Sequence, residues 1–442
     1  MTAISPSRVF GANERINVGI IGVGLIGRIQ TRAFAKQPDA RIIGISETFK
    51  PRLDLGVELA GGKAKRYPDF RKMLENKDVD AVVVATPDHW HGLQTMLACA
   101  AGKDVYVEKP FSLFVKEGRW MVETARRYKR VVQVGTQNRS GPIFERARQL
   151  IQAGELGEIV SIQANYFRNL MPGLGHPPNG TPPDNFDWEM FNGPAPQRPY
   201  NPLRGIYNFR WFWDTSGGQV TNLGQHSLDV VHWFTGVRAP KSVYSYGGRH
   251  FLKDICETPD TQDIILEYPG FPVVCQYREA TAGQKGVGMG GLTIFGTKGS
   301  MRISRAGFQL SPDPKRHPIN TFANIIGGHP VGGPQPIEEE KDQLWTEPVQ
   351  DNKGDAPGDY VRHVRNFLDC VKSRKDPAVT AESGHRVATA CHLANISLQT
   401  GRKLNWDPAR EQIIGDPQAN AKLLKLYRRP WDAELRALGV RI

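Results

Sequence analysis

The chain has 442 residues, of which 39% are hydrophobic, so it is too long for one ordinary core and we expect two domains. No run approaches the roughly 18 apolar residues that cross a bilayer, which argues against a membrane-spanning protein. Lysine and arginine (57) outnumber aspartate and glutamate (45), giving a net charge of +12. The basic residues are scattered, with one cluster at 422–431, so we expect no nucleic-acid partner and no membrane partner.

The first residues lack the apolar core of a signal peptide. We therefore expect residues 1–15 to be a lead-in and the protein to be cytoplasmic, with a periplasmic location as the alternative if a leader was removed. Five cysteines lie far apart and form no CxxC motif. This pattern favours free thiols over a disulfide framework or a zinc site.

Between residues 16 and 140, short apolar runs alternate with amphipathic, helix-like segments. We expect strands at 16–22, 40–46, 80–86, 104–109 and 131–135. Strands that are apolar throughout and alternate with helices predict a parallel sheet covered on both faces.

The pattern changes after about residue 141. Residues 158–168 alternate like a half-buried strand, and 169–216 are rich in Pro, Gly and aromatic residues, which predicts a mostly irregular, functional loop. Several segments within 239–304 resemble antiparallel strands joined by short turns. The remaining expected parts are a second polar insertion at 306–356 and helices at about 358–373 and 383–401.

The first expected strand runs directly into Gly22-Val23-Gly24-Leu25-Ile26-Gly27. A GxGxxG motif after a strand and before a helix predicts dinucleotide binding. Gly22 would permit the tight turn, Gly24 would let the backbone approach the pyrophosphate, and Gly27 would let helix and strand pack closely. Leu25 and Ile26 open the helix whose N-terminus faces the phosphates.

Glu47 ends the second expected strand, 20 residues after Gly27. An acidic residue there can accept hydrogen bonds from the adenosine ribose and repel a 2′-phosphate. The sequence therefore favours NAD over NADP, although Arg28, Lys50 and Arg52 lie close enough in sequence to favour the phosphate.

Glu108, Lys109 and Pro110 lie at the carboxyl end of the expected strand at 104–109, at the sheet edge where such folds bind ligands. A lysine there is desolvated, which disfavours its ammonium form. It could remove a proton from a substrate hydroxyl or bind that hydroxyl as a donor. A surface lysine at a strand end is the plain alternative.

The glycine loop, AVVVATPDHWH and VEKPF together resemble the Gfo/Idh/MocA family of oxidoreductases, named for glucose–fructose oxidoreductase and inositol dehydrogenase. The resemblance extends over about residues 16–140 and continues more loosely through 217–233 and 293–303. It implies a Rossmann domain at 16–140 and an α+β domain at 141–442 with a large, mostly antiparallel open sheet.

The same resemblance implies NAD(P)-dependent oxidation of a sugar or cyclitol hydroxyl in a homodimer or homotetramer. Lys109 falls on the family's catalytic lysine and Glu108 on its partner in the EKP motif. Thr86, Pro87 and His91 fall in a loop that borders the nicotinamide in similar proteins.

The stretch GGQVTNLGQHSLDVVHW (217–233) has helical periodicity. In a regular α-helix Asn222, His226 and Asp229 would share one face, whereas His232 would point away and pack beside Trp233. No HExxH motif is present, so we expect no metal site.

By resemblance, His226 matches a family histidine, and Asn222 occupies the place of an aspartate. Asparagine cannot accept a proton, but it can orient a neighbour. His226 is then the candidate general base, with Lys109 as hydrogen-bond donor. Whether Asp229 replaces the missing carboxylate is left open.

Further substrate contacts are expected from Arg139, at the rim of the parallel sheet, and from an aromatic group that suits carbohydrates. That group comprises Tyr166, Arg168, Trp188, Tyr207, Arg210, Trp211 and Trp213. A surface salt bridge for Arg139 and an aromatic mini-core for the others are equally open. Of these, Arg168 and Trp213 are the main candidates for substrate binding, beside Lys109, Asn222 and His226.

The favoured function is an NAD-dependent dehydrogenase of a sugar, sugar derivative or cyclitol. Two alternatives are kept. One is an NAD-dependent glycosidase that oxidises C3 transiently and cleaves by elimination. The other is a non-catalytic NAD-binding regulatory relative.

Overall fold

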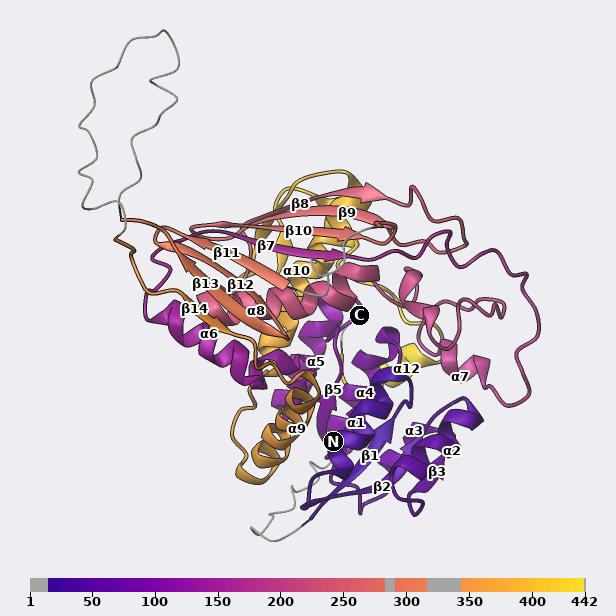
Figure 1. Cartoon of the computed structure of the whole chain (residues 1–442). Coiled ribbons are helices and arrows are strands. Elements are labelled where there is room, and N and C mark those ends of the chain that lie inside the picture. Colours follow the sequence, from indigo (N-terminus) through magenta and orange to yellow (C-terminus); the bar gives the residue numbers. More distant parts are fainter. Residues whose placement is uncertain (1–14, 283–290, 316–342, 441–442) are drawn as a thin grey trace, which may run out of the picture.

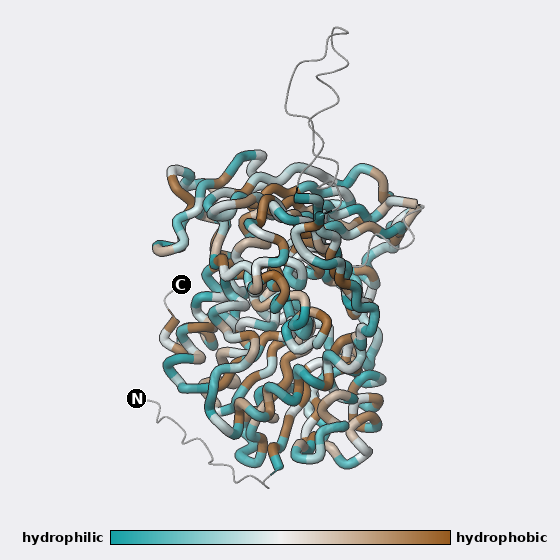
Figure 2. The backbone as a smooth tube through the Cα atoms, turned by 60° about the vertical axis from the view of Figure 1, so that its left-hand side comes forward, coloured by the Kyte–Doolittle hydropathy of each residue, from teal (hydrophilic) through white to brown (hydrophobic). Residues whose placement is uncertain are grey.

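The computed structural model describes residues 15–282, 291–315 and 343–440. These residues form two sheets, one of six strands and one of ten, stacked with helices between them (Figure 1). Hydrophobic stretches run through the inside of the molecule in the tube view (Figure 2). No helix in these ranges is long and apolar enough to cross a membrane.

The N-terminal sheet has the strand order β3-β2-β1-β4-β5-β6, and all of its neighbouring strands are parallel. Its strands are β1 (Ile16–Ile21), β2 (Ala40–Ser46), β3 (Lys65–Tyr67), β4 (Ala81–Val84), β5 (Asp104–Val107) and β6 (Val132–Val134). Helices α1 (Leu25–Ala35), α2 (Lys50–Leu59), α3 (Phe70–Leu74), α4 (Asp88–Ala100) and α5 (Val115–Arg127) accompany them, followed by η1 (Gln137–Ser140). The predicted Rossmann sheet is thus confirmed. Its order reverses between β1 and β4, where such sheets form a ligand crevice.

The second sheet has the order β14-β13-β12-β11-β7-β10-β9-β8-β15-β16 and is antiparallel except for the pair β7 and β10. Its strands are β7 (Ile159–Phe167), β8 (Ser242–Gly248), β9 (Thr261–Glu267), β10 (Pro272–Arg278), β11 (Gly291–Gly296), β12 (Gly299–Ser304), β13 (Gly307–Pro312), β14 (Val349–Asp351), β15 (Leu404–Asp407) and β16 (Gln412–Ile413). Helices α6 (Pro142–Gln152), α8 (Gln225–Thr235) and α10 (Ala381–Thr400) lie on the side facing the Rossmann domain (Figure 1). The predicted α+β domain with a large open sheet is confirmed.

The predicted polar insertion at 306–356 is partly wrong, because β13 and β14 lie inside it and extend the sheet. Phe308 and Leu310 on β13 are buried, but this apolar alternation is too short to stand out in a polar sequence. Residues 316–342 of that segment lie outside the described ranges.

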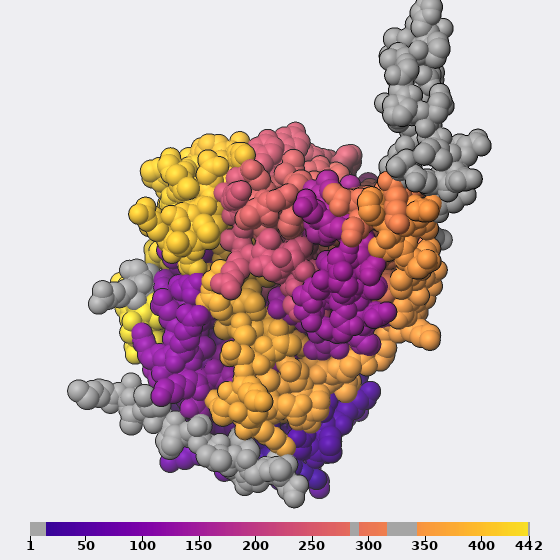
Figure 3. Space-filling model, turned by 90° about the vertical axis from the view of Figure 1, so that its left-hand side faces the viewer, coloured from indigo at the N-terminus to yellow at the C-terminus, as the bar shows by residue number. Residues whose placement is uncertain are grey.

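The helices near the C-terminus are α9 (Ala356–Ser373) and α10, close to the predicted 358–373 and 383–401. α9 packs on the Rossmann domain, with Phe367 in edge contact with Phe34 of α1. In the space-filling view the orange surface of this part reaches down to the indigo N-terminal part (Figure 3). The short helices α11 (Pro417–Ala421) and α12 (Trp431–Ala437) follow, and Trp431 packs against Trp90. The chain from α9 onward therefore contributes to both cores, which differs from the predicted boundary after residue 140.

Residues 169–216 are mostly irregular, as predicted, apart from the short α7 (Trp188–Asn192) and η2 (Asn208–Trp211). This segment crosses to the Rossmann domain. Asp187 N donates to Thr48 O at 2.9 Å, and Lys50 N donates to Asn185 O at 2.9 Å. Phe186 packs on Phe49 at the same place.

The predicted single α-helix at 219–233 is also partly wrong. Its first turn is the π-helical η3 (Val220–Gly224), and regular α-helix begins only at α8. A π-turn rotates the residues before it relative to those after it. The side chains on either side of it are therefore not related by the regular spacing of about 100° per residue of an α-helix. His232, expected to pack, is buried and lies 2.8 Å from Tyr268 Oη through its Nε2 atom.

Candidate functional site

A cavity of about 1010 Å³ lies between the carboxyl ends of the Rossmann strands and the second domain. It is lined by the glycine loop, the ends of β2, β4 and β5, the end of β7, the loop before η2, the η3–α8 junction and the turn after β12. The predicted residues among its walls are Gly22, Gly24, Leu25, Ile26, Glu47, Thr86, Pro87, His91, Glu108, Lys109, Tyr166, Arg168, Tyr207, Arg210, Asn222 and His226.

The glycine loop has a geometry that suits a pyrophosphate. Gly22 has φ +91°, and a Cβ there would lie 2.6 Å from Ala85 O. A Cβ at Gly27 would lie 2.1 Å from Gly22 O, so helix and strand approach too closely for a side chain. Gly24 instead faces the cavity, where a Cβ would meet only Arg52 Nη1 at 3.8 Å. The N-terminus of α1 thus opens on space for an anionic group.

Glu47 is fixed by backbone donors at the end of β2. Its Oε2 accepts from Val23 N at 2.8 Å, and its Oε1 accepts from Thr48 N at 2.8 Å and from Phe49 N at 3.1 Å. Partial burial lowers the pKa of the neighbouring Arg52, and the Glu47 charge opposes that effect. The carboxylate lines the cavity beside the glycine loop, where an adenosine ribose would lie.

The loop after β4 is braced by its histidine. His91 Nδ1 lies 2.7 Å from Pro110 O and its Nε2 lies 2.9 Å from Thr86 O, so both ring nitrogens face carbonyl oxygens of the chain. Thr86 Oγ1 donates to Gln94 Oε1 at 2.7 Å. His91 therefore fixes the loop and the Lys109–Pro110 turn. The Lys109–Pro110 peptide is cis.

Lys109 projects into the cavity and is held by Asn222. Its Nζ donates to Asn222 O at 2.5 Å and to Asn222 Oδ1 at 2.9 Å. Burial lowers the pKa of Lys109, and the adjacent Glu108 charge opposes the shift. Burial likewise raises the pKa of Glu108, whose Oε1 accepts from Gln30 Nε2 at 2.6 Å.

Asn222 begins a chain of hydrogen bonds that ends at a carboxylate. Asn222 Nδ2 donates to Gln219 Oε1 at 2.9 Å, and Gln219 Nε2 donates to Glu279 Oε1. Arg168 Nε donates to Glu279 Oε2 at 2.7 Å. Along this series of hydrogen bonds, the side-chain amides of Asn222 and Gln219 therefore stand between Lys109 and the carboxylate of Glu279. Sequence reasoning missed Gln219 and Glu279, because Glu279 directly follows β10 and carries no motif.

His226 lines the cavity, and burial favours its neutral form. Its Nδ1 atom is buried and has no hydrogen-bond partner among the described residues. Burial, and after it the charges of Arg305 and Lys109, hold the pKa of His226 well below its ordinary value. Arg305, another wall residue, donates from Nε to Asn138 Oδ1 at 3.0 Å. Sequence reasoning missed Arg305, which occupies the turn between β12 and β13.

Several predicted site residues do not reach the cavity. Arg139 Nη2 lies 2.6 Å from Asp229 Oδ1 in a buried ion pair, so Asp229 does not orient His226. Trp213 N donates to Glu257 Oε2 at 2.9 Å, and its side chain is not a wall residue. The cavity walls therefore give no support to the predicted substrate contacts of Arg139 and Trp213. Trp188 and Trp211 belong to small cores, as the alternative reading allowed.

Residues 15–282, 291–315 and 343–440 contain no group of three or more His, Cys, Asp or Glu side chains that could hold a metal ion. The five cysteines are buried and unpaired. The residues around the cavity instead fit a dinucleotide, through the open face at Gly24, the carboxylate of Glu47 and the N-terminus of α1.

Family models match most of the chain. Residues 16–136 match "Oxidoreductase family, NAD-binding Rossmann fold", 144–302 match "GFO/IDH/MocA C-terminal domain", and 347–433 match "Oxidoreductase family, C-terminal alpha/beta domain".

Curated proteins of similar sequence include members of the same family. The chain is 30% identical over 412 residues to a myo-inositol 2-dehydrogenase of Thermotoga maritima, covering 90% of this chain and 100% of the relative. It is 28% identical over 253 residues to the rhizopine catabolism protein MocA of Rhizobium meliloti, covering 57% of this chain and 68% of the relative.

Solved structures share the fold. A levoglucosan dehydrogenase in complex with NADH and levoglucosan superposes with a TM-score of 0.66 at 18% identity, covering 89% of this chain and 99% of that chain. A scyllo-inositol dehydrogenase from Lactobacillus casei with bound NAD(H) and scyllo-inositol gives a TM-score of 0.61 at 19% identity, covering 89% of this chain and 100% of that chain. The protein therefore belongs to the Gfo/Idh/MocA family and is an NAD-dependent oxidoreductase that acts on CH–OH groups.

Proposed function

We propose that the protein is an NAD-dependent dehydrogenase of a sugar, a sugar derivative or a cyclitol. The observation that carries this proposal is the position of Lys109 Nζ, which Asn222 holds in the same cavity as the glycine loop and His226. Relatives named for inositol and levoglucosan oxidation support this substrate class.

In this proposal Lys109 removes the hydroxyl proton. Lys109 Nζ donates two hydrogen bonds to Asn222, and its remaining tetrahedral position is available to a substrate hydroxyl. Burial favours the neutral amine, whose lone pair can take the proton. His226, kept neutral by burial and by the charge of Arg305, orients the hydroxyl by a hydrogen bond. When bound, NAD accepts the hydride at its nicotinamide ring.

This assignment moves the proton acceptor from His226, the candidate from the sequence, to Lys109. The reason is that no carboxylate contacts His226 among the described residues, and that burial and the charge of Arg305 disfavour an imidazolium.

A panel of sugars and cyclitols with NAD and with NADP, followed at the nicotinamide absorbance, tests the proposal. We expect Lys109→Met to lower kcat/KM by roughly a thousandfold, because the proton acceptor is lost. The matched control is Lys50→Met, since the Lys50 side chain is exposed and pairs only with Asp54 in the described ranges. Undiminished turnover by Lys109→Met would contradict the proposal.

The NAD-dependent glycosidase is kept as a second candidate. Two observations favour it: Tyr207 and Phe209 of the 169–216 segment line the cavity, where aromatic faces can stack on a pyranose, and Asn222 replaces the family's aspartate. Release of nitrophenol from aryl glycosides without NADH accumulation would select it. Steady NADH formation with a free sugar would reject it. The comparisons favour an enzyme over the non-catalytic alternative.

We also propose a homodimer or homotetramer built through the outer face of the ten-stranded sheet. Tyr244 and Ile265 are paired neighbours on β8 and β9 and are exposed, at 41% and 50%, beside Tyr246 at 66%. Three large apolar side chains on adjacent strands favour a covered surface. Light scattering with Tyr246→Glu tests this proposal, and an unchanged oligomer mass would contradict it. The cytoplasmic location expected from the sequence stays a prediction.

A further inference from the structure

Positive charge gathers at the substrate end of the cavity. Lys109, Arg168, Arg210 and Arg305 all line it. Glu279 neutralises Arg168, and Glu108 lies beside Lys109. The remaining two guanidinium groups are Arg305, whose Nε donates to the neutral Asn138, and Arg210.

Arg210 comes from η2 in the loop that covers the cavity. Its Nη1 donates to Tyr207 O at 2.6 Å, and its Cζ lies 4.3 Å from the Tyr207 ring centroid and 4.8 Å from that of Phe209. Within the part of the chain that the structure describes, this guanidinium takes part in no ion pair, and its hydrogen bond goes to the Tyr207 carbonyl. Two aromatic rings and a carbonyl thus hold a cation in a fixed position without neutralising it.

The charge of the wall residue Asp88 acts on Arg210, but Asp88 forms no ion pair with it in the described ranges. Asp88 is buried at the start of α4 and accepts a hydrogen bond from Ser216. Burial raises the pKa of Asp88, which favours its neutral form. A desolvated cation without a counterion is costly, so such a group in a cavity is expected to meet an anion supplied by a ligand.

We propose that Arg210 binds a carboxylate of the substrate, so that the protein oxidises a sugar acid or another carboxylated sugar derivative. Because Nη1 bonds Tyr207 O, the Nε and Nη2 atoms form the edge left for a ligand, and this edge matches the two oxygens of a carboxylate. This inference rests on the proposed dehydrogenase function and names its substrate class.

An oxyanion at Arg210 could also come from the cofactor. The glycine loop already provides the N-terminus of α1 and the nearby Arg52 for the pyrophosphate. Arg210 instead lies near Lys109 and Arg168. Its charge lowers the pKa of Lys109, and the charge of Arg168 lowers the pKa of Arg210. This placement favours the substrate as the source.

The test compares matched pairs, glucose with glucuronate and galactose with galacturonate, and includes glucose 6-phosphate. We expect the wild type to prefer the acid by at least about tenfold in kcat/KM. Arg210→Gln is expected to abolish this acid-over-neutral preference, a loss of about tenfold through KM, and Arg210→Lys to restore part of it. Arg198→Gln is the matched control, because Arg198 lies in the same loop but pairs with Asp214 on the surface. Its preference should equal that of the wild type.

Three results would overturn the inference: equal kcat/KM for acids and neutral sugars, a preference for glucose 6-phosphate over glucuronate, or an Arg210→Gln effect that appears in the KM for NAD alone. Melting temperatures of the NADH-loaded protein separate this inference from the proposed function. If no compound of the panel reduces NAD, the dehydrogenase proposal fails. Stabilisation by glucuronate in the wild type but not in Arg210→Gln would still support the carboxylate site, and its absence from both would refute it.

Discussion

At the scale of single residues, Asn222 decides the proton balance of the site. An aspartate at this position would place a full negative charge against Lys109 Nζ, whereas the asparagine offers the dipole of its side-chain Oδ1 beside that of the backbone carbonyl. A neighbouring anion favours the ammonium form and a dipole does so less. Asn222 therefore leaves burial as the main influence on Lys109, which lowers its pKa from the ordinary value of 10.5.

The pH dependence of Asn222→Asp follows from this difference. If neutral Lys109 is the base, kcat/KM for oxidation rises with pH through the pKa of Lys109. The midpoint of this rising limb of the pH profile lies below 10.5 in the wild type. A carboxylate at 222 raises that pKa, so we expect the limb to move up by about one pH unit. Asn222→Ala adds no charge and is the control. An upward shift in both variants, or in neither, would contradict the argument.

Two glycines of the nucleotide loop are expected to behave differently when they are substituted. At Gly24 a Cβ has open space, so Gly24→Val should fold normally while its side chain blocks the pyrophosphate position and weakens NAD binding by about a hundredfold. At Gly27 a Cβ would lie 2.1 Å from Gly22 O, so Gly27→Val should lower the melting temperature as well. Calorimetric NAD titration and thermal unfolding of both variants check this contrast. Equal melting temperatures would contradict it.

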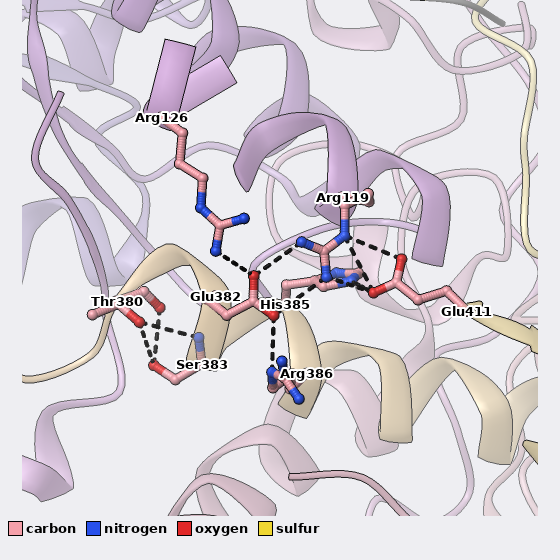
Figure 4. A network of polar contacts seen from close by, with 8 residues as sticks. All are labelled: Arg119, Arg126, Thr380, Glu382, Ser383, His385, Arg386 and Glu411. Carbon is pink, nitrogen blue, oxygen red and sulfur yellow. Dashed lines mark hydrogen bonds and ion pairs between the residues drawn. The ribbon is translucent and has the colours of Figure 1, made fainter. Parts of the chain in front are cut away.

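At the scale of elements, a network of charges joins α5, α10 and the β15–β16 hairpin (Figure 4). Arg119 Nη1 lies 2.9 Å from Glu382 Oε2, and its Nη2 lies 2.6 Å from Glu411 Oε1. His385 Nε2 lies 2.7 Å from the same Glu411 oxygen. Partial burial acts to raise the pKa of both carboxyls, but hydrogen bonds from Arg119, and for Glu411 also from His385, lower each to about 2.

This network predicts an acid-sensitive contribution to stability. Because both folded-state pKa values lie below the ordinary 4.5, the contribution is complete above about pH 4.5 and is lost as the pH falls towards 2. Arg119→Met should cost about 2 kcal/mol of unfolding free energy near neutral pH and less near about pH 3. Arg126→Met is the control, because Arg126 is 65% exposed and contributes little. Urea titrations at both pH values measure the difference. An equal cost at both would contradict the assignment.

The sequence predicted the elements whose signals are local. The apolar runs before Gly22 and before Lys109 predicted strands that the structure confirms, since a buried parallel strand is apolar along its whole length. The π-turn at 220–224 could not be predicted, because it leaves the apolar pattern of a helix unchanged. Arg139 was misassigned because its partner Asp229 is 90 residues away in sequence and is brought to it only by the packing of α8 on η1.

At the scale of the whole molecule, the cavity walls come from both domains, so NAD binds only the folded chain. We expect NAD at about 100 times its Kd to stabilise the protein by roughly 2.7 kcal/mol. NADP at the same concentration should stabilise it less, because Glu47 repels a 2′-phosphate. Thermal unfolding with each nucleotide measures this. Glu47→Gln should reduce the difference, and an unchanged difference would argue against the role of Glu47.

The segment that crosses from the second domain to Thr48, Phe49 and Lys50 has a kinetic consequence. It attaches next to Glu47, at the end of the cavity where we expect the adenosine, through backbone hydrogen bonds and the Phe49–Phe186 contact. Separation of the two domains at this end of the cavity requires these bonds to break, because they join the segment to the Rossmann domain. We therefore expect the residence time of NAD to be governed by the rate at which this bridge opens, and to be long compared with what its equilibrium affinity alone would suggest.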